Sequence, residues 1–107
     1  MADKVDNFGG WSETKDATDE TQKICNQVKD QVEKRSGKKY RDFEAVKYRA
    51  QFLAGGEHVL IQVHVGAEDY IHLSISKIVG TLKGQNYELR GVEQHKTKED
   101  PLVPFKN

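Results

Sequence analysis

The sequence has a single cysteine, no excess of charge of either sign and no long apolar run. One cysteine, Cys25, cannot form an internal disulfide and favours a reducing, cytoplasmic setting. The 17 basic residues balance 17 acidic ones, whereas nucleic-acid-binding proteins usually carry a basic excess. No segment approaches the roughly 20 apolar residues that span a bilayer, and MADKVDNFGG lacks the apolar stretch of a signal peptide. We therefore expect no nucleic-acid partner and no membrane partner.

The chain is also short and polar, with 107 residues of which 36% are hydrophobic and 32% charged. This length predicts a single domain over residues 1–107. A chain of this size buries roughly 60–70% of its unfolded surface, which corresponds to one sheet face covered by one helix. The core should therefore be thin.

One segment, TDETQKICNQVKDQVEKRSG, has the pattern of an amphipathic helix. Thr18 suits the N-cap, and Gly37 suits the position that follows the last turn. Acidic residues after Thr18 and basic residues before Gly37 complement the helix dipole. The apolar residues that recur every four positions are Ile24, Val28 and Val32. No periodicity precedes this helix, so we expect residues 1–17 to form a largely flexible N-terminal arm.

After the helix, apolar residues alternate with polar ones, as in β-strands. Two strands each place their alternating apolar side chains on one face, and residues 66–69 form the hairpin turn between them. These side chains are Val59, Ile61, Val63 and Val65 in the first strand and Ile71, Leu73 and Ile75 in the second. A weaker strand surrounds Tyr87 and Leu89. After it comes a charged tail in which Leu102 and Phe105 are expected to pack back on the domain.

The strand before these, within YRDFEAVKYRA, has a phase error. Val46, Tyr48 and Ala50 alternate, whereas Phe43 is out of phase with them, so we expect a β-bulge near Glu44 or Ala45. The elements together predict an α+β fold, with a single helix packed on a four- to five-stranded antiparallel sheet. The apolar side chains of the sheet should all point to the helix side.

Few residues could carry catalysis or bind a metal. If Val65 pairs with Ile71, His64 lies opposite His72 on the outer face of the sheet. Two imidazoles are fewer than the three or four ligands of a zinc site, so a solvated pair of histidines is the better interpretation. Cys25 has no neighbouring base in sequence and is interpreted as a partly buried apolar residue. We expect no enzyme activity, no metal and no cofactor.

Apolar residues lie instead where water should reach them. Phe8 and Trp11 belong to the arm, and Phe52 and Leu53 lie at a hairpin end. Alternate turns of a meander lie at the same end of the sheet, so the turns near 53–56 and 80–86 should be neighbours. With the arm they would form one apolar edge, which is typical of a binding surface. The alternative is that these side chains fold back onto the core.

Four stretches resemble the stefins, the disulfide-free type 1 cystatins, in their order and near their spacing. They are GGWSETKDATDETQ, QFLAG, VHVGAEDYIHL and LRGVEQHKTKEDPL, and the resemblance runs from Gly9 to Phe105. It implies a cystatin-like fold, in which a helix is cradled by a five-stranded antiparallel sheet. It also implies reversible, tight-binding, non-covalent inhibition of papain-like cysteine proteases such as cathepsins. The N-terminal arm and two hairpin loops would form a wedge that occludes the active-site cleft.

The resemblance carries over to particular residues. Gly9 and Gly10 match the N-terminal glycines of the family. The first loop matches the Gln-x-Val-x-Gly hairpin motif, with Leu53 in place of the valine. The second loop is one residue longer than usual and lacks the Leu-Pro pair of the family. Its length places Val79 and Gly80 there, whereas local similarity places Leu82, Lys83 and Gly84 there, which we prefer.

The expected protease-binding residues are therefore Phe8, Gly9, Gly10, Gln51, Phe52, Leu53, Ala54, Gly55, Leu82, Lys83 and Gly84. Phe8 is predicted to occupy the apolar S2 pocket of the protease. The alternative function is a non-inhibitory protein-binding module on the same fold. We expect a monomer, with a dimer formed by exchange of hairpins as the other oligomeric state.

Overall fold

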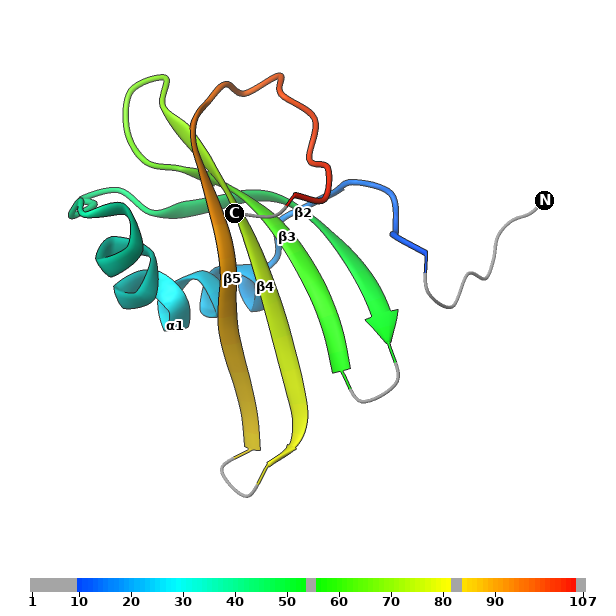
Figure 1. The fold of residues 1–107 in the computed structure, drawn as a ribbon. Coiled ribbons are helices and arrows are strands. Elements are labelled where there is room, and N and C mark those ends of the chain that lie inside the picture. Colours follow the sequence, from blue (N-terminus) through cyan, green and yellow to red (C-terminus); the bar gives the residue numbers. More distant parts are fainter. Residues whose placement is uncertain (1–9, 54–55, 82–83, 106–107) are drawn as a thin grey trace.

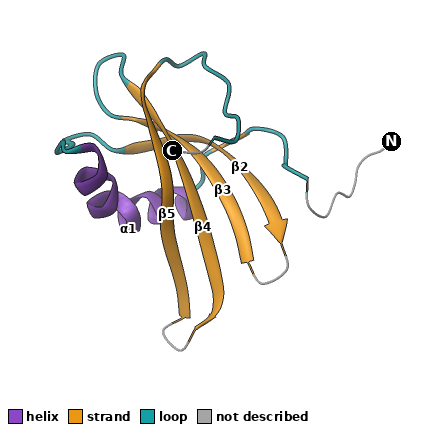
Figure 2. Cartoon of the chain, viewed as in Figure 1, coloured by secondary structure: helices purple, strands orange, loops and turns teal. Residues whose placement is uncertain are grey.

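The computed structural model describes residues 10–53, 56–81 and 84–105. Its elements follow the order β1 (Lys15–Asp16), α1 (Asp19–Ser36), β2 (Glu44–Leu53), β3 (Gly56–His64), β4 (Tyr70–Thr81) and β5 (Gly84–Lys96). The strands form one antiparallel sheet in the order β1-β2-β3-β4-β5 (Figure 1). The helix lies against one face of this sheet (Figure 2). The predicted α+β fold is confirmed.

Both ends of α1 lie where the sequence predicts them. The Thr18 side chain accepts a hydrogen bond from the backbone N–H of Thr21, and the Thr21 hydroxyl accepts one from the N–H of Thr18. Gly37 ends the helix in the left-handed conformation, with φ of 76°, and its N–H donates to the carbonyl of Glu33. These bonds satisfy backbone groups that the helix itself leaves without partners.

The core lies between α1 and the sheet. The helix contributes a buried stripe that includes the expected valines and also Cys25, which is fully buried and not partly buried as expected. The facing side chains come from the strands, at alternate positions except across the bulge between Leu89 and Val92. They are Val59, Ile61, Val63, Ile71, Leu73, Ile75, Tyr87, Leu89 and Val92.

The phase error in β2 is resolved by a bulge one residue beyond the predicted place. Ala45 pairs with Val63 and Lys47 pairs with Gln62, so Val46 is the extra residue. The insertion lets Ala45, before the bulge, and Tyr48, after it, both pack against the core.

The predicted register of the β3–β4 hairpin is wrong by two residues. Val63, and not Val65, pairs with Ile71, which places His64 opposite Tyr70 and His72 opposite Gln62. The cause is that β3 ends at His64, so residue 65 belongs to the connecting loop. The predicted turn over residues 66–69 closes through a bond from the N–H of Asp69 to the carbonyl of Gly66 (2.8 Å).

The outer face of the sheet is also covered, contrary to the expectation of a single apolar face. The chain after β5 crosses this face (Figure 1). Leu102 is buried, as expected, and Phe105 is half-buried. Beneath this segment Leu60 and His72 are only 1% exposed, so the histidine is not solvated as we had expected. The domain therefore has apolar contacts on both sides of the sheet.

Candidate functional site

The two hairpins that the resemblance implicates end at the same edge of the sheet. Figure 1 shows that β2 and β4 end, and β3 and β5 begin, at one edge of the sheet, with the β3–β4 loop at the opposite end. Leu53 pairs with Gly56 at the end of the first hairpin, and Gly56 pairs in turn with Ile78 of β4. Adjacent strands thus place the two hairpin ends next to each other.

The second hairpin ends between Thr81 and Gly84, which pair with each other. Val79 and Gly80 lie within β4, so the connection is made by residues 82–83. Of the preferred second-loop residues, Gly84 begins β5, whereas Leu82 and Lys83 lie outside the described residues, as do Ala54 and Gly55 of the first loop.

The N-terminal segment joins this edge through β2. Trp11 forms a β-bridge with Gln51, two residues before β2 ends. The next residue, Ser12, donates its backbone N–H to the carbonyl of Ala50 (2.8 Å), and its hydroxyl accepts the N–H of Ala50 (3.0 Å). Gly10 is exposed beside Trp11, and Phe8 and Gly9 lie outside the described residues. The segment therefore reaches Gln51 from the open side of β2.

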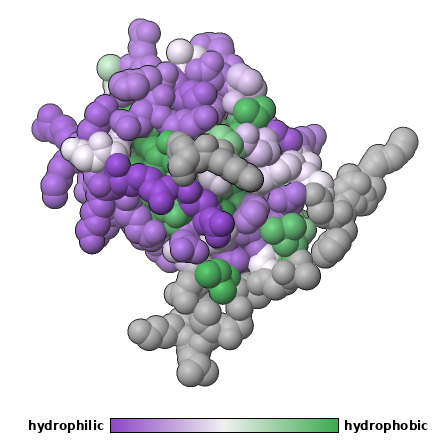
Figure 3. All heavy atoms as spheres, viewed as in Figure 1, coloured by the Kyte–Doolittle hydropathy of each residue, from purple (hydrophilic) through white to green (hydrophobic). Residues whose placement is uncertain are grey.

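This edge carries exposed apolar side chains. Phe52 is 62% exposed and Ile78 is 42% exposed, whereas Leu53 is half-buried. Outside residues 79–86, Val103 is the one other large apolar side chain of the described residues that is exposed to this degree. Figure 3 shows hydrophobic atoms close to the hairpin ends. Phe52 has not folded back onto the core, which the sequence left as an alternative.

Gly56 is a residue of this edge that the sequence analysis missed. A Cβ built on Gly56 would overlap the backbone carbonyl oxygen of Lys77. Only glycine allows β3 and β4 to approach so closely at this point. The sequence shows a pair of glycines at positions 55–56, but the Gln-x-Val-x-Gly motif includes only the first of them.

Ile78 was missed as well. It pairs with Gly56 of β3, level with Leu53 at the end of β2, and its side chain is exposed.

The described residues hold no arrangement suited to catalysis. Burial raises the pKa of the Cys25 thiol to about 12, so the nucleophilic thiolate is not formed at neutral pH. No group of three or more metal-ligating side chains occurs in the described part of the chain. Within the same residues, no helix combines the length and the apolar character needed to cross a membrane.

Comparison with known proteins identifies the family of the chain. The model of the cystatin domain matches residues 9–99. The chain is 42% identical over 99 residues to Cystatin-A1 of Sus scrofa, covering 91% of this chain and 92% of that protein. It is 40% identical to Stefin-1 of Mus musculus, covering 92% and 99% of the two chains. It is also 40% identical to Leukocyte cysteine proteinase inhibitor 1 of Sus scrofa, covering 91% and 92%. The chain therefore belongs to the cystatins, in their type 1 branch, the stefins, a family of cysteine protease inhibitors and not of enzymes.

Proposed function

We propose that this protein is a reversible, tight-binding, non-covalent inhibitor of papain-like cysteine proteases. Residues 8–11, 51–55 and 82–84, which we call the inhibitory edge, would enter the active-site cleft together. The observation that carries the proposal is the pairing of Trp11 with Gln51 beside two hairpins that end at the same edge of the sheet. The relative named as a cysteine proteinase inhibitor supports it.

The edge suits a groove that is shaped for an extended peptide. The hairpin ends continue from paired strands, so little conformational entropy is lost when they bind. Exposed Phe52 supplies apolar area that binding would remove from water. The wedge blocks the cleft without presenting a scissile peptide bond to the protease cysteine, and therefore no covalent step is needed.

The N-terminal segment would supply the specificity contact. Gly9 and Gly10 lack a Cβ, which lets the backbone pass close to the wall of the cleft. Phe8 would then enter the apolar S2 pocket. Gln51 and the backbone of Ala54 and Gly55 would bond to the rim of the cleft, and residues 82–84 would fill its other side.

The direct test is titration of active-site-titrated papain with the full chain. We expect loss of activity at one inhibitor per enzyme, full recovery when the complex dissociates, and two unmodified masses after denaturation. A persistent adduct would contradict the non-covalent mechanism. Full papain activity in the presence of excess chain would contradict inhibition and favour the non-inhibitory binding module.

We also propose that the protein acts as a monomer in the cytoplasm. Cys25 is buried and forms no disulfide, which suits a protein that works in a reducing setting. Light scattering of the purified chain measures the oligomeric state, and a dimer would point to exchange of hairpins.

A further inference from the structure

Arg49 lies in β2 and bonds to both terminal segments of the chain. Its Nε donates a hydrogen bond to the backbone carbonyl of Ser12 (2.8 Å), and its Nη1 donates one to the backbone carbonyl of Leu102 (2.7 Å). The guanidinium is planar and carries several donors in fixed directions, so one side chain can hold two acceptors at once. Arg49 thus joins two segments that lie far apart in the sequence.

On the N-terminal side, Ser12 is held at every polar group. Its N–H and hydroxyl bond to Ala50, and its carbonyl accepts from Arg49. Ser12 directly follows Trp11, which pairs with Gln51. The bond from Arg49 therefore holds the N-terminal segment at Ser12, the residue next to the inhibitory edge.

On the C-terminal side, the partner residue is itself anchored. Leu102 is 5% exposed and lies on the outer face of the sheet. None of the ion pairs among the described residues includes Arg49, so backbone carbonyls accept its hydrogen bonds in place of a carboxylate. Hydrogen bonds with an ionised donor are about twice as strong as neutral ones.

We propose that Arg49 is a positioning residue for protease inhibition. It ties the N-terminal and C-terminal segments to β2, and it thereby holds Trp11 and Ser12 in place beside the first hairpin, from which the N-terminal segment would enter the cleft. The proposal rests on the proposed inhibitory function. Through its bond to Arg49, the C-terminal segment also helps to support the inhibitory edge.

The first readout is local and needs no protease. Trp11 is the single tryptophan of the chain, so its fluorescence reports the N-terminal segment alone. Arg49→Met keeps an unbranched side chain as long as the aliphatic part of arginine but removes the guanidinium and its donors. We expect acrylamide to quench Trp11 more strongly in this variant than in the unchanged chain, while far-UV circular dichroism remains that of the folded domain. Leu102→Ala should shift the quenching in the same direction, because it loosens the second partner of Arg49.

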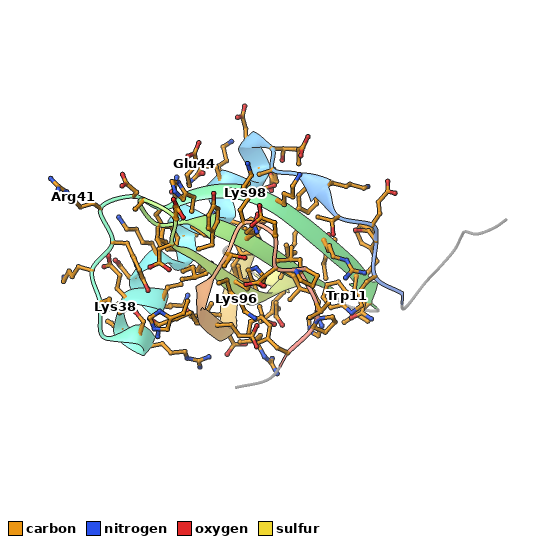
Figure 4. All side chains as sticks on the ribbon, turned by 90° about the horizontal axis from the view of Figure 1, so that it is seen from above. Trp11, Lys38, Arg41, Glu44, Lys96 and Lys98 are labelled. Atoms are coloured by element: carbon orange, nitrogen blue, oxygen red, sulfur yellow. The ribbon has the colours of Figure 1, made fainter. Side chains whose placement is uncertain are left out.

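The control for the loss of an arginine is Arg41→Met. Arg41 is exposed and lies at the end of the molecule away from Trp11 (Figure 4). This variant should leave both the quenching and the inhibition constant unchanged.

The second readout is inhibition of papain by full-length variants. Arg49→Met should raise the inhibition constant about tenfold, the size expected for a lost charge-assisted hydrogen bond. In a Phe8→Ala background the same change should cost much less, since the residue that Arg49 helps to direct is gone. Failure of the unchanged chain to inhibit would overturn the proposed function. Two results, obtained while the unchanged chain inhibits normally, would overturn the role of Arg49. One is that acrylamide quenches Trp11 equally in Arg49→Met and in the unchanged chain. The other is that Arg49→Met weakens inhibition equally with Phe8 present and in the Phe8→Ala background.

Discussion

The indole ring of Trp11 stacks on the imidazole ring of His58, with ring centroids 6.3 Å apart and planes inclined by 23°. Both residues pair with Gln51, Trp11 from the open side of β2 and His58 from β3. The rings therefore meet across the strand that separates them. This contact and the bonds of Ser12 hold the N-terminal segment next to the first hairpin.

Removing the imidazole should loosen this segment. Aromatic pairs contribute about 0.5–1.5 kcal/mol beyond the area they bury, so His58→Ala should speed hydrogen exchange of the Ser12 amide by up to about tenfold. His64→Ala, at the opposite end of β3, serves as the control and should leave that amide unchanged. Equal exchange rates in His58→Ala and the unchanged chain would show that the stack contributes nothing to docking.

Phe52 should matter for inhibition and not for folding. Its side chain is 62% exposed, so Phe52→Ala should change the free energy of unfolding by less than about 0.5 kcal/mol. Burial of the ring against a protease would contribute roughly 1.5–3 kcal/mol, and the inhibition constant for papain should rise by one to two decades. Val103→Ala removes another exposed apolar side chain and should alter neither quantity. If Phe52→Ala destabilised the domain instead, the ring would have a structural role.

The helix and the order of the strands could be predicted because their signals are local. The caps at Thr18 and Gly37 lie next to the turns that they complete, and the period of the apolar residues depends only on neighbours in the sequence. The β3–β4 register could not be predicted in the same way. Val65 continues the alternation of β3, yet it lies in the loop, and only the pairing of His64 with Tyr70 reveals this.

The covered outer face was missed for a related reason. The tail contains Leu102 and Phe105, which were expected to pack back on the domain, but nothing local shows that residues 100–105 cross the sheet over Leu60 and His72. The same holds for the site. The hairpin ends could be placed from the meander, whereas the bonds of Arg49 to Ser12 and Leu102 join segments that no sequence pattern connects.

The Cys25 thiol should be unreactive in the folded protein. It is fully buried, and burial raises its pKa to about 12, so the thiolate that attacks disulfide reagents is scarce at pH 8. An aromatic disulfide reagent should therefore label the chain slowly in buffer and at once in denaturant. Fast labelling under native conditions would mean that α1 separates readily from the sheet.

His72 should make stability depend on pH. Its ring is 1% exposed beneath the C-terminal segment, and among the described residues neither of its nitrogens has a hydrogen-bond partner. Burial lowers its pKa, and nearby Lys96 lowers it further, against the opposing effect of Glu93 and Asp100. In the unfolded chain the pKa returns to about 6.5. Between these two values the unfolded chain binds more protons than the folded one.

Stability should therefore fall as the pH drops below about 6.5, by at most about 1.4 kcal/mol per pH unit from this residue, and level off below the pKa of the folded state. The pKa values of the Asp16 and Asp100 carboxyls are lowered by their hydrogen bonds, so these groups weaken the fold only at more acidic pH. Urea unfolding at pH 7.5 and pH 5.0 measures the difference. His72→Gln keeps a polar side chain without a titrating ring, and it should shrink that difference. An identical pH dependence in the variant would assign the effect to other groups.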